Sequence, residues 1–410
     1  MYRKKVMPYA LFFIWPFMSL VLACVNYSKR YTSNILWGFF IFYGMTILIP
    51  DFASDHDLVR YQMAFERGIS RKNLPFIEAF MIPYGKGIYS AGDFYLNFMN
   101  LVVARISNNF RVFLMVIALV LGFFCSRNLT IAFKYLNTNK KTVFTFILFF
   151  TCLMIYPFWS IAGYRFVTAA NIFIYGVLHL ELYKKNRYFI FILVSPLVHF
   201  TFYFALLVYI LYKIIGNRFT IYLTFLLVSL FASNINPQTL HGNSELAPVF
   251  MQNKIRGYTS ERNVKSVRLQ ESRANWYVKG HTQALLFGTL YLVVLLWWKR
   301  KKMRKSATYY NLLCFGLLLL AISTLLSPIP SMFRFSLAAI FIIMVSLMLI
   351  NFKTKLFNSY SSALALLLFL GFIIVRVRIG FDETGLNTLF LNPFISSFFP
   401  DSPPLIDFVK

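Results

Sequence analysis

Acidic residues are scarce in this chain, yet three of the fourteen lie within seven positions, at Asp51, Asp55 and Asp57. Arg60 and Tyr61 complete the same stretch. A carboxylate there could take a proton from a sugar hydroxyl, and a neighbouring guanidinium could bind phosphate or hold the acid in place. Asp and Ser also favour the capping turn that starts a helix. We therefore treat Asp55 and Asp57 as candidate bases and Arg60 and Tyr61 as candidate binding residues, with a solvated capping turn as the alternative.

The pattern R-F-x-x-A-A occurs twice, at residues 165–170 and 334–339. Each copy opens an apolar segment, which predicts that Arg165 and Arg334 lie in the first turn of a helix. The alanines one turn later allow close helix packing. An arginine there adds its fork of donors to the unpaired backbone N–H groups and the positive end of the helix dipole, and a diphosphate fits such a site. The alternative is an arginine that reaches to lipid phosphates.

His199 lies deep in an apolar segment, about 12 residues from Arg187 and about 14 from Lys213. Histidine is rare inside a bilayer and often functional there. It is therefore a third candidate base, and a structural histidine bonded to a backbone carbonyl is the alternative.

A basic stretch at residues 254–279 mixes lysines and arginines with aromatic residues, among them Arg256 and Tyr258. Aromatic rings stack on sugar rings, and cations hold acidic groups. Arg256 and Tyr258 are thus candidate substrate-binding residues, unless the stretch is simply a solvated loop.

Several catalytic signatures are missing from the sequence: a Walker A loop, HExxH, GxSxG and paired metal ligands. ATP-driven transport, zinc hydrolysis and serine hydrolysis therefore lack support, and we expect neither a metal nor another cofactor. The four cysteines all lie in apolar segments without a CxxC pair, which argues against a disulfide framework or a zinc site.

The elements that must position these residues are transmembrane helices. Hydrophobic residues make up 59% of the chain and charged residues only 13%. Eleven apolar segments approach the roughly 20 helical residues that cross a bilayer, and their lack of alternation excludes a β-barrel. They span residues 7–26, 34–50, 110–125, 142–158, 166–183, 188–212, 219–233, 284–298, 309–326, 335–350 and 362–375. We expect an all-α polytopic bundle of about 11–12 spans, a single transmembrane domain over residues 1–410.

The orientation follows from the basic residues between segments. The dense basic turn at residues 299–305 should lie in the cytoplasm. Counting from it places residues 51–105 and 236–283 outside, as two long outer loops, and the first of these includes a predicted interfacial helix at residues 93–105. The net charge of +27 is spread over short clusters between apolar segments, so membrane orientation explains it better than nucleic-acid binding.

The segment at residues 188–212 has basic residues at both ends. We interpret it as two short helices bent back on each other, with Ser195 and Pro196 breaking the run and His199 near the bend. This places the N-terminus outside, against the orientation preference of Arg3, Lys4 and Lys5. A single straight span would reverse the N-terminal half.

Taken in order, these features resemble the polysaccharide polymerases: the Wzy O-antigen polymerases and, within them, the EpsG-like exopolysaccharide polymerases. The resemblance lies in the acidic stretch at residues 55–61, the arginine at residues 164–169 and the histidine at residues 198–200. The resemblance in sequence covers residues 34–211. In the rest of the chain, only the arrangement of apolar segments is similar. This chain has Arg165-Phe166 where the family often has Arg-Gln, and Ser54-Asp55 where it often has Gly-Thr-Asp.

The resemblance implies a GT-C-like, metal-independent membrane glycosyltransferase at the periplasmic face of the bacterial inner membrane. It would transfer a growing glycan from undecaprenyl diphosphate to a hydroxyl of the next lipid-linked repeat unit, in O-antigen or exopolysaccharide synthesis. Arg165 and Arg334 would bind the diphosphate, Arg60 would position the donor or the acid, and Asp55, Asp57 or His199 would act as base. The implied partners are undecaprenyl-diphosphate-linked oligosaccharide, the lipid bilayer and a chain-length regulator protein.

Two other functions fit parts of the pattern. An O-antigen ligase carries a large outer loop with basic residues and histidines, for which His241 and His281 could serve. A flippase or transporter of lipid-linked sugars should place charges in the middle of several spans, often in repeated halves. The ionisable residues here lie mainly at outer helix ends, which favours the enzyme.

Overall fold

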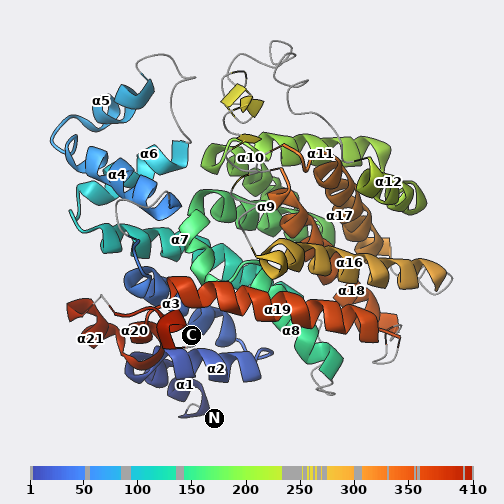
Figure 1. The fold of residues 1–410 in the computed structure, drawn as a ribbon, viewed down its shortest axis with the longest axis horizontal. Helices are drawn as coiled ribbons and strands as arrows, with labels where there is room; N and C mark the ends of the chain where they lie inside the picture. Colours follow the sequence, from blue (N-terminus) through green and yellow to red (C-terminus); the bar gives the residue numbers. More distant parts are fainter. Residues whose placement is uncertain are drawn as a thin grey trace.

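The computed structural model describes residues 3–50, 56–84, 94–134, 143–232, 275–299, 307–329, 332–354, 361–399 and 402–408, together with residue 357 and short pieces between residues 252 and 269. This part of the chain is an all-α bundle (Figure 1), and it contains isolated backbone bridges but no strand. The predicted fold class is confirmed.

Five helical segments are long and apolar enough to cross a membrane. They are α7 (Phe110–Phe133), α8 (Val143–Ile155) continued through η2 (Phe158–Gly163) into α9 (Tyr164–Tyr183), α16 (Trp276–Trp298), α18 (Arg334–Thr354) and α19 (Ala363–Glu383). Shorter helices fill the remaining predicted segments: α3 (Thr32–Thr46), α10 (Phe189–Val198), α11 (Phe202–Ile215), α12 (Phe219–Phe231) and α17 (Ala307–Leu325). The chain is a multi-pass membrane protein. Both α7 and α19 continue about two turns beyond their predicted ends.

The helices α3 and α7 pack closely because each presents a glycine to the other. A Cβ atom on Gly44 would lie 2.8 Å from the Leu114 carbonyl oxygen, and one on Gly122 would lie 2.5 Å from Cβ of Phe40. Such close approach is typical of membrane helix pairs.

The predicted hairpin at residues 188–212 is confirmed, and its bend lies at residues 199–201. Phe189 near the start of α10 contacts Tyr209 near the end of α11, so the two helices run in opposite directions. Pro196 stays inside α10 and does not break it. Proline leaves the carbonyl four residues earlier without its N–H donor. The Ser195 hydroxyl donates to that Ile192 carbonyl, at 2.8 Å, and so compensates within the helix.

The first apolar segment is also a hairpin, so the predicted continuous span at residues 7–26 is wrong. It forms α1 (Arg3–Ile14) and α2 (Pro16–Val25), and the Ser19 hydroxyl of α2 donates back to the Pro8 carbonyl of α1 at 2.9 Å. Proline at position 16 is tolerated because it starts the new helix.

This fold-back places the N-terminus relative to the other helix ends. The Tyr9 hydroxyl of α1 accepts a hydrogen bond from Asn34, near the start of α3, and Arg127 bonds to the same Asn34. Helix α1 therefore begins at the same end as Arg30 and Arg127, and the side of the membrane that this end faces stays a prediction.

The opposite end of the bundle carries several short helices. Figure 1 shows α4 (Asp57–Ile69), α5 (Phe76–Met81) and α6 (Phe94–Ala104) grouped together beside α10, and α20 (Leu386–Phe390) and α21 (Pro393–Phe398) beside the α1–α2 hairpin. The helix expected at residues 93–105 is thus α6, and Phe94 and Phe98 are exposed on it. Its position at a membrane interface stays a prediction.

Candidate functional site

Four helix ends from distant parts of the sequence meet at this end of the bundle: the start of α4, the start of α9, the start of α18 and the α10–α11 bend. Each brings one of the predicted site residues: Tyr61, Arg165, Arg334 and His199. Contacts between aromatic rings and guanidinium groups join them, as described next.

Tyr61 and Arg165 form the closest pair in the site. The Tyr61 hydroxyl accepts a hydrogen bond from Arg165 Nε at 3.3 Å, and the guanidinium carbon lies 5.2 Å from the centre of the Tyr61 ring. The Tyr164 ring packs on the other side of this contact, 4.4 Å from Tyr61. Burial raises the pKa of Tyr61, and the guanidinium groups of Arg165 and Arg334 oppose that rise. Tyr61 therefore remains a neutral hydroxyl at physiological pH, able to donate its proton to a ligand.

The two R-F-x-x-A-A sequences come together in space. The rings of Phe166 and Phe335 lie 5.2 Å apart, and the Arg334 guanidinium lies over Phe166 at 5.9 Å. The four alanines are fully buried. The alanines let α9 and α18 begin side by side, so both arginines open helices in the same region. The two helices are in contact with each other.

His199 is buried at the bend of the α10–α11 hairpin, with its ring 5.6 Å from Phe166. Its Nδ1 lies 2.7 Å from the Thr201 hydroxyl and 3.4 Å from the Thr201 backbone nitrogen. Because a backbone N–H can only donate, this geometry makes Nδ1 an acceptor and places the proton of the neutral ring on Nε2. In this tautomer Nε2 carries the proton and can donate a hydrogen bond, and the predicted role of His199 as a base stays a prediction.

The acidic stretch begins α4. His56 caps the helix, since its Nδ1 accepts from the Leu58 N–H, and Asp57 is the first helical residue. Asp57 and Arg60 form an exposed ion pair at 3.5 Å. The expected capping turn is therefore present at His56, and Asp57 is close enough to Tyr61 to act on it electrostatically. Asp55 lies outside the described residues.

The remaining predicted residues are Arg256 and Tyr258. Arg256 is exposed, in a part of the chain where only short pieces are described, and Tyr258 lies outside the described residues. Their proposed role in substrate binding stays a prediction.

Two arginines that we did not single out from the sequence support the same end of the bundle. Arg111 donates to the carbonyls of Met45 and Ile47, and Arg376 donates to those of Met154 and Ile155. They cap the ends of α3 and α8, where helix carbonyls lack partners. In the sequence, the only sign of such a role is an arginine close to the end of an apolar segment. We predicted that the last apolar segment ends at residue 375, so Arg376 seemed to lie outside the helix.

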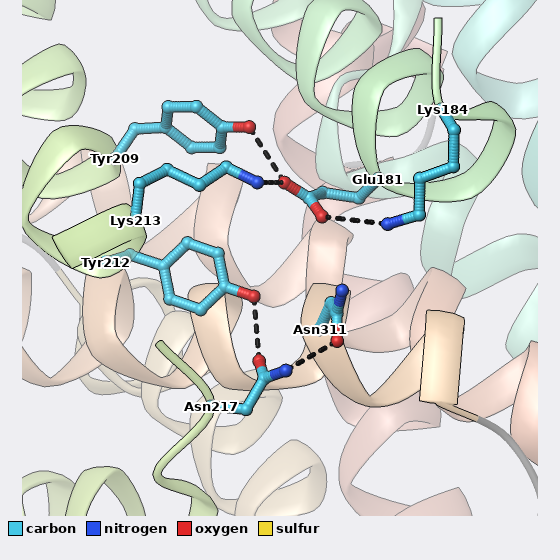
Figure 2. A network of polar contacts seen from close by, with 7 residues as sticks. All are labelled: Glu181, Lys184, Tyr209, Tyr212, Lys213, Asn217 and Asn311. Carbon is cyan, nitrogen blue, oxygen red and sulfur yellow. Dashed lines mark hydrogen bonds and ion pairs between the residues drawn. The ribbon is translucent and has the colours of Figure 1, made fainter. Parts of the chain in front are cut away.

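A polar network at the other end of the bundle was also missed (Figure 2). Glu181 of α9 is fully buried, accepts from the Tyr209 hydroxyl at 2.8 Å and pairs with Lys213 and Lys184. Asn217 links Tyr212 of α11 to Asn311 of α17. This network ties the end of α11 to α9 and α17.

Comparison with known proteins adds one match. A family model described as the EpsG family matches residues 35–381, a range that includes Tyr61, Arg165, His199 and Arg334. No curated protein and no solved structure matches the chain.

Proposed function

Since the chain belongs to the EpsG family and its motifs resemble those of polysaccharide polymerases, we propose that it joins undecaprenyl-diphosphate-linked repeat units of a surface polysaccharide at the periplasmic face of the bacterial inner membrane. The observation that carries this proposal is that Arg165 and Arg334 begin helices in the same region: Arg165 bonds to the Tyr61 hydroxyl, Arg334 lies over Phe166, and both charges act on Tyr61. Two guanidinium groups at the starts of two neighbouring helices suit a ligand with two adjacent phosphates.

In this proposal the diphosphate of the donor lipid binds between Arg165 and Arg334. The positive ends of the α9 and α18 dipoles add to the two fixed charges. As the bond between the sugar and the diphosphate breaks, negative charge grows on the leaving phosphate oxygen. Arginines that are already in place stabilise this charge without a metal ion.

The acceptor hydroxyl oxygen attacks the anomeric carbon of the donor glycan, and undecaprenyl diphosphate leaves. The hydroxyl proton passes to a carboxylate, for which Asp55 and Asp57 are the candidates. The tautomer of His199 changes its proposed role from base to donor: its Nε2–H donates to an oxygen of the donor substrate. Tyr61 holds Arg165 in place and offers its own proton to the diphosphate, and Arg60 holds Asp57.

A deletion strain tests the general function. It should make surface polysaccharide with a single repeat unit instead of a long ladder, because polymerisation alone is lost. Loss of every repeat on the gel would instead indicate a flippase or a ligase. In a ligase the loop histidines would be central; here His281 Nδ1 lies 2.6 Å from the Val278 carbonyl oxygen, and His241 is outside the described residues.

Complementation with Arg165→Ala tests the diphosphate role. We expect no ladder at a normal protein level in the membrane. Arg218→Ala at the other end of the bundle is the matched control and should restore the ladder. A full ladder with Arg165→Ala would contradict the proposed role.

A further inference from the structure

A second polar cluster lies on one face of α19, near its last turns. Arg376, Gly380 and Glu383 are spaced four and three residues apart, which places them on the same side of the helix. Trp159 of η2 packs directly on this face: a Cβ on Gly380 would lie 2.8 Å from the Trp159 ring. The cluster is thus built from α19 and from the short helix that leads into Arg165.

Three buried polar atoms of this cluster have no hydrogen-bond partner among the described residues: the Tyr156 hydroxyl, Trp159 Nε1 and Glu383 Oε2. Tyr156 and Trp159 are only 4% and 6% exposed. Buried polar atoms in native proteins nearly always have a partner, and those without one in the chain are expected to meet a water or a ligand.

Arg376 holds these atoms together. Its bonds to the Met154 and Ile155 carbonyls place it beside Tyr156, and it interacts electrostatically with both Tyr156 and Glu383. Arg376 and Glu383 nevertheless form no ion pair within 4.0 Å in the described structure. The two groups lie about two turns apart on one face of α19, so a ligand hydroxyl placed between them could bond to both.

The composition of the cluster discriminates between ligands. A phosphate would be repelled by the Glu383 carboxylate. A neutral sugar offers hydroxyl groups that donate to a carboxylate and accept from Trp Nε1–H, Tyr O–H and a guanidinium. Aromatic side chains beside such donors are typical of carbohydrate sites.

We propose that Tyr156, Trp159, Arg376 and Glu383 form a sugar-binding subsite for the acceptor repeat unit, with Glu383 accepting a hydrogen bond from a sugar hydroxyl. This inference rests on the proposed function and deepens it. Trp159 and Arg165 are six residues apart across the end of η2, so the subsite adjoins the diphosphate site through a short, continuous stretch of backbone.

The test measures binding of the strain's own repeat-unit oligosaccharide, released from its lipid by mild acid, to the full-length protein in nanodiscs. Glu383→Gln and Trp159→Phe should each weaken binding about tenfold, the usual effect of losing a hydrogen bond to a charged group or in a desolvated site. Tyr156→Phe removes only the hydroxyl and should weaken it several-fold. Binding of undecaprenyl diphosphate should not change in any of them.

Asp382→Asn is the matched control. Asp382 is adjacent in sequence but exposed, and it pairs with Arg378 at 3.0 Å on a different side of α19. It should bind the oligosaccharide as the wild type does, and thermal unfolding should show that all variants are folded.

Unchanged oligosaccharide binding in Glu383→Gln and Tyr156→Phe would overturn the subsite, while Arg165→Ala could still abolish the ladder and leave the proposed function intact. Conversely, a chain that binds oligosaccharide through Glu383 but leaves a normal ladder when deleted would refute the polymerase and keep the subsite. A Tyr156→Phe variant that is more stable and binds normally would show that water alone fills the cluster, against the proposal.

Discussion

Positively charged side chains at the two ends of α9 have different kinds of partner. At the end shown in Figure 2, Lys184 and Lys213 both pair with the fully buried Glu181, and Tyr209 donates to the same carboxylate. At the other end, the Arg165 and Arg334 guanidinium groups lie against the aromatic rings of Tyr61 and Phe166. Ring faces stabilise a cation without matching its hydrogen bonds. The first arrangement pairs its cations with a carboxylate of the same bundle, whereas in the second the described contacts of the two guanidinium groups include ring faces and a tyrosine hydroxyl, which suits our proposal of an anionic ligand.

The largest expected effect is on turnover at the arginine end. Arg165→Ala and Arg334→Ala should each lower the polymerisation rate in proteoliposomes by about 10²–10³, the usual loss for one donor to a developing charge. The melting temperature should stay within a few degrees of the wild type. Because both arginines would hold one diphosphate, the double variant should lose less than the product of the two single effects. Fully multiplicative losses would show that they act on separate groups.

The Glu181 end should respond in stability. Glu181→Leu leaves Lys184 and Lys213 without their shared carboxylate, and we expect a loss of about 2–4 kcal/mol, below the value for a wholly buried pair because both lysines reach solvent. Thermal unfolding in detergent measures this. KM for the lipid-linked substrate should stay constant in the folded fraction. A normal melting temperature with a raised KM would instead show that the Glu181 end belongs to the substrate site. The two ends of α9 would then not differ in function.

The tautomer of His199 predicts an intermediate effect. Glutamine places an N–H donor near the position of Nε2, whereas asparagine places it near Nδ1. His199→Gln should therefore keep about a tenth of the activity, and His199→Asn clearly less. If His199 were the base, both variants would be equally inactive and would remove the acidic limb of the pH–rate profile.

Tyr61→Phe should have the smallest effect, about threefold in kcat, because Arg165 keeps its contact with the ring. The pKa of Tyr61 is raised, so the neutral hydroxyl contributes stability that is complete below the ordinary tyrosine pKa and is lost as pH rises through the higher folded value. Wild-type activity should therefore show no loss through Tyr61 between about pH 7 and pH 9. A loss in that range that is absent from Tyr61→Phe would contradict the neutral hydroxyl.

Features with a local signal were predictable from the sequence. Basic residues at both ends of residues 188–212 indicated the hairpin, and a repeated short pattern indicated that Arg165 and Arg334 begin helices. The sequence could not show that the two copies meet, because that depends on the packing of Phe166 against Phe335 across about 170 positions.

Other features of the structure could not be predicted from the residues next to them in the sequence. The turn at Trp15 looks like the middle of one span, because Pro16 follows an uninterrupted apolar run. Glu181 is close in sequence to Lys184 and Lys185, and its burial depends on Tyr209 and Lys213 of another helix. The sugar-binding cluster brings together Trp159 and Glu383, which only the tertiary fold relates.

The α1–α2 fold-back also bears on how the protein is inserted. A hairpin whose two ends emerge on the same side of the membrane does not change the side on which the following chain lies. The insertion machinery therefore does not have to move a flanking loop across the membrane to insert this hairpin. A chain that begins at α3 should therefore insert with every later helix in its normal orientation. Reporter enzymes fused before residue 3 and just before residue 32 should then be active on the same side of the membrane, the side of the basic turn at residues 299–305.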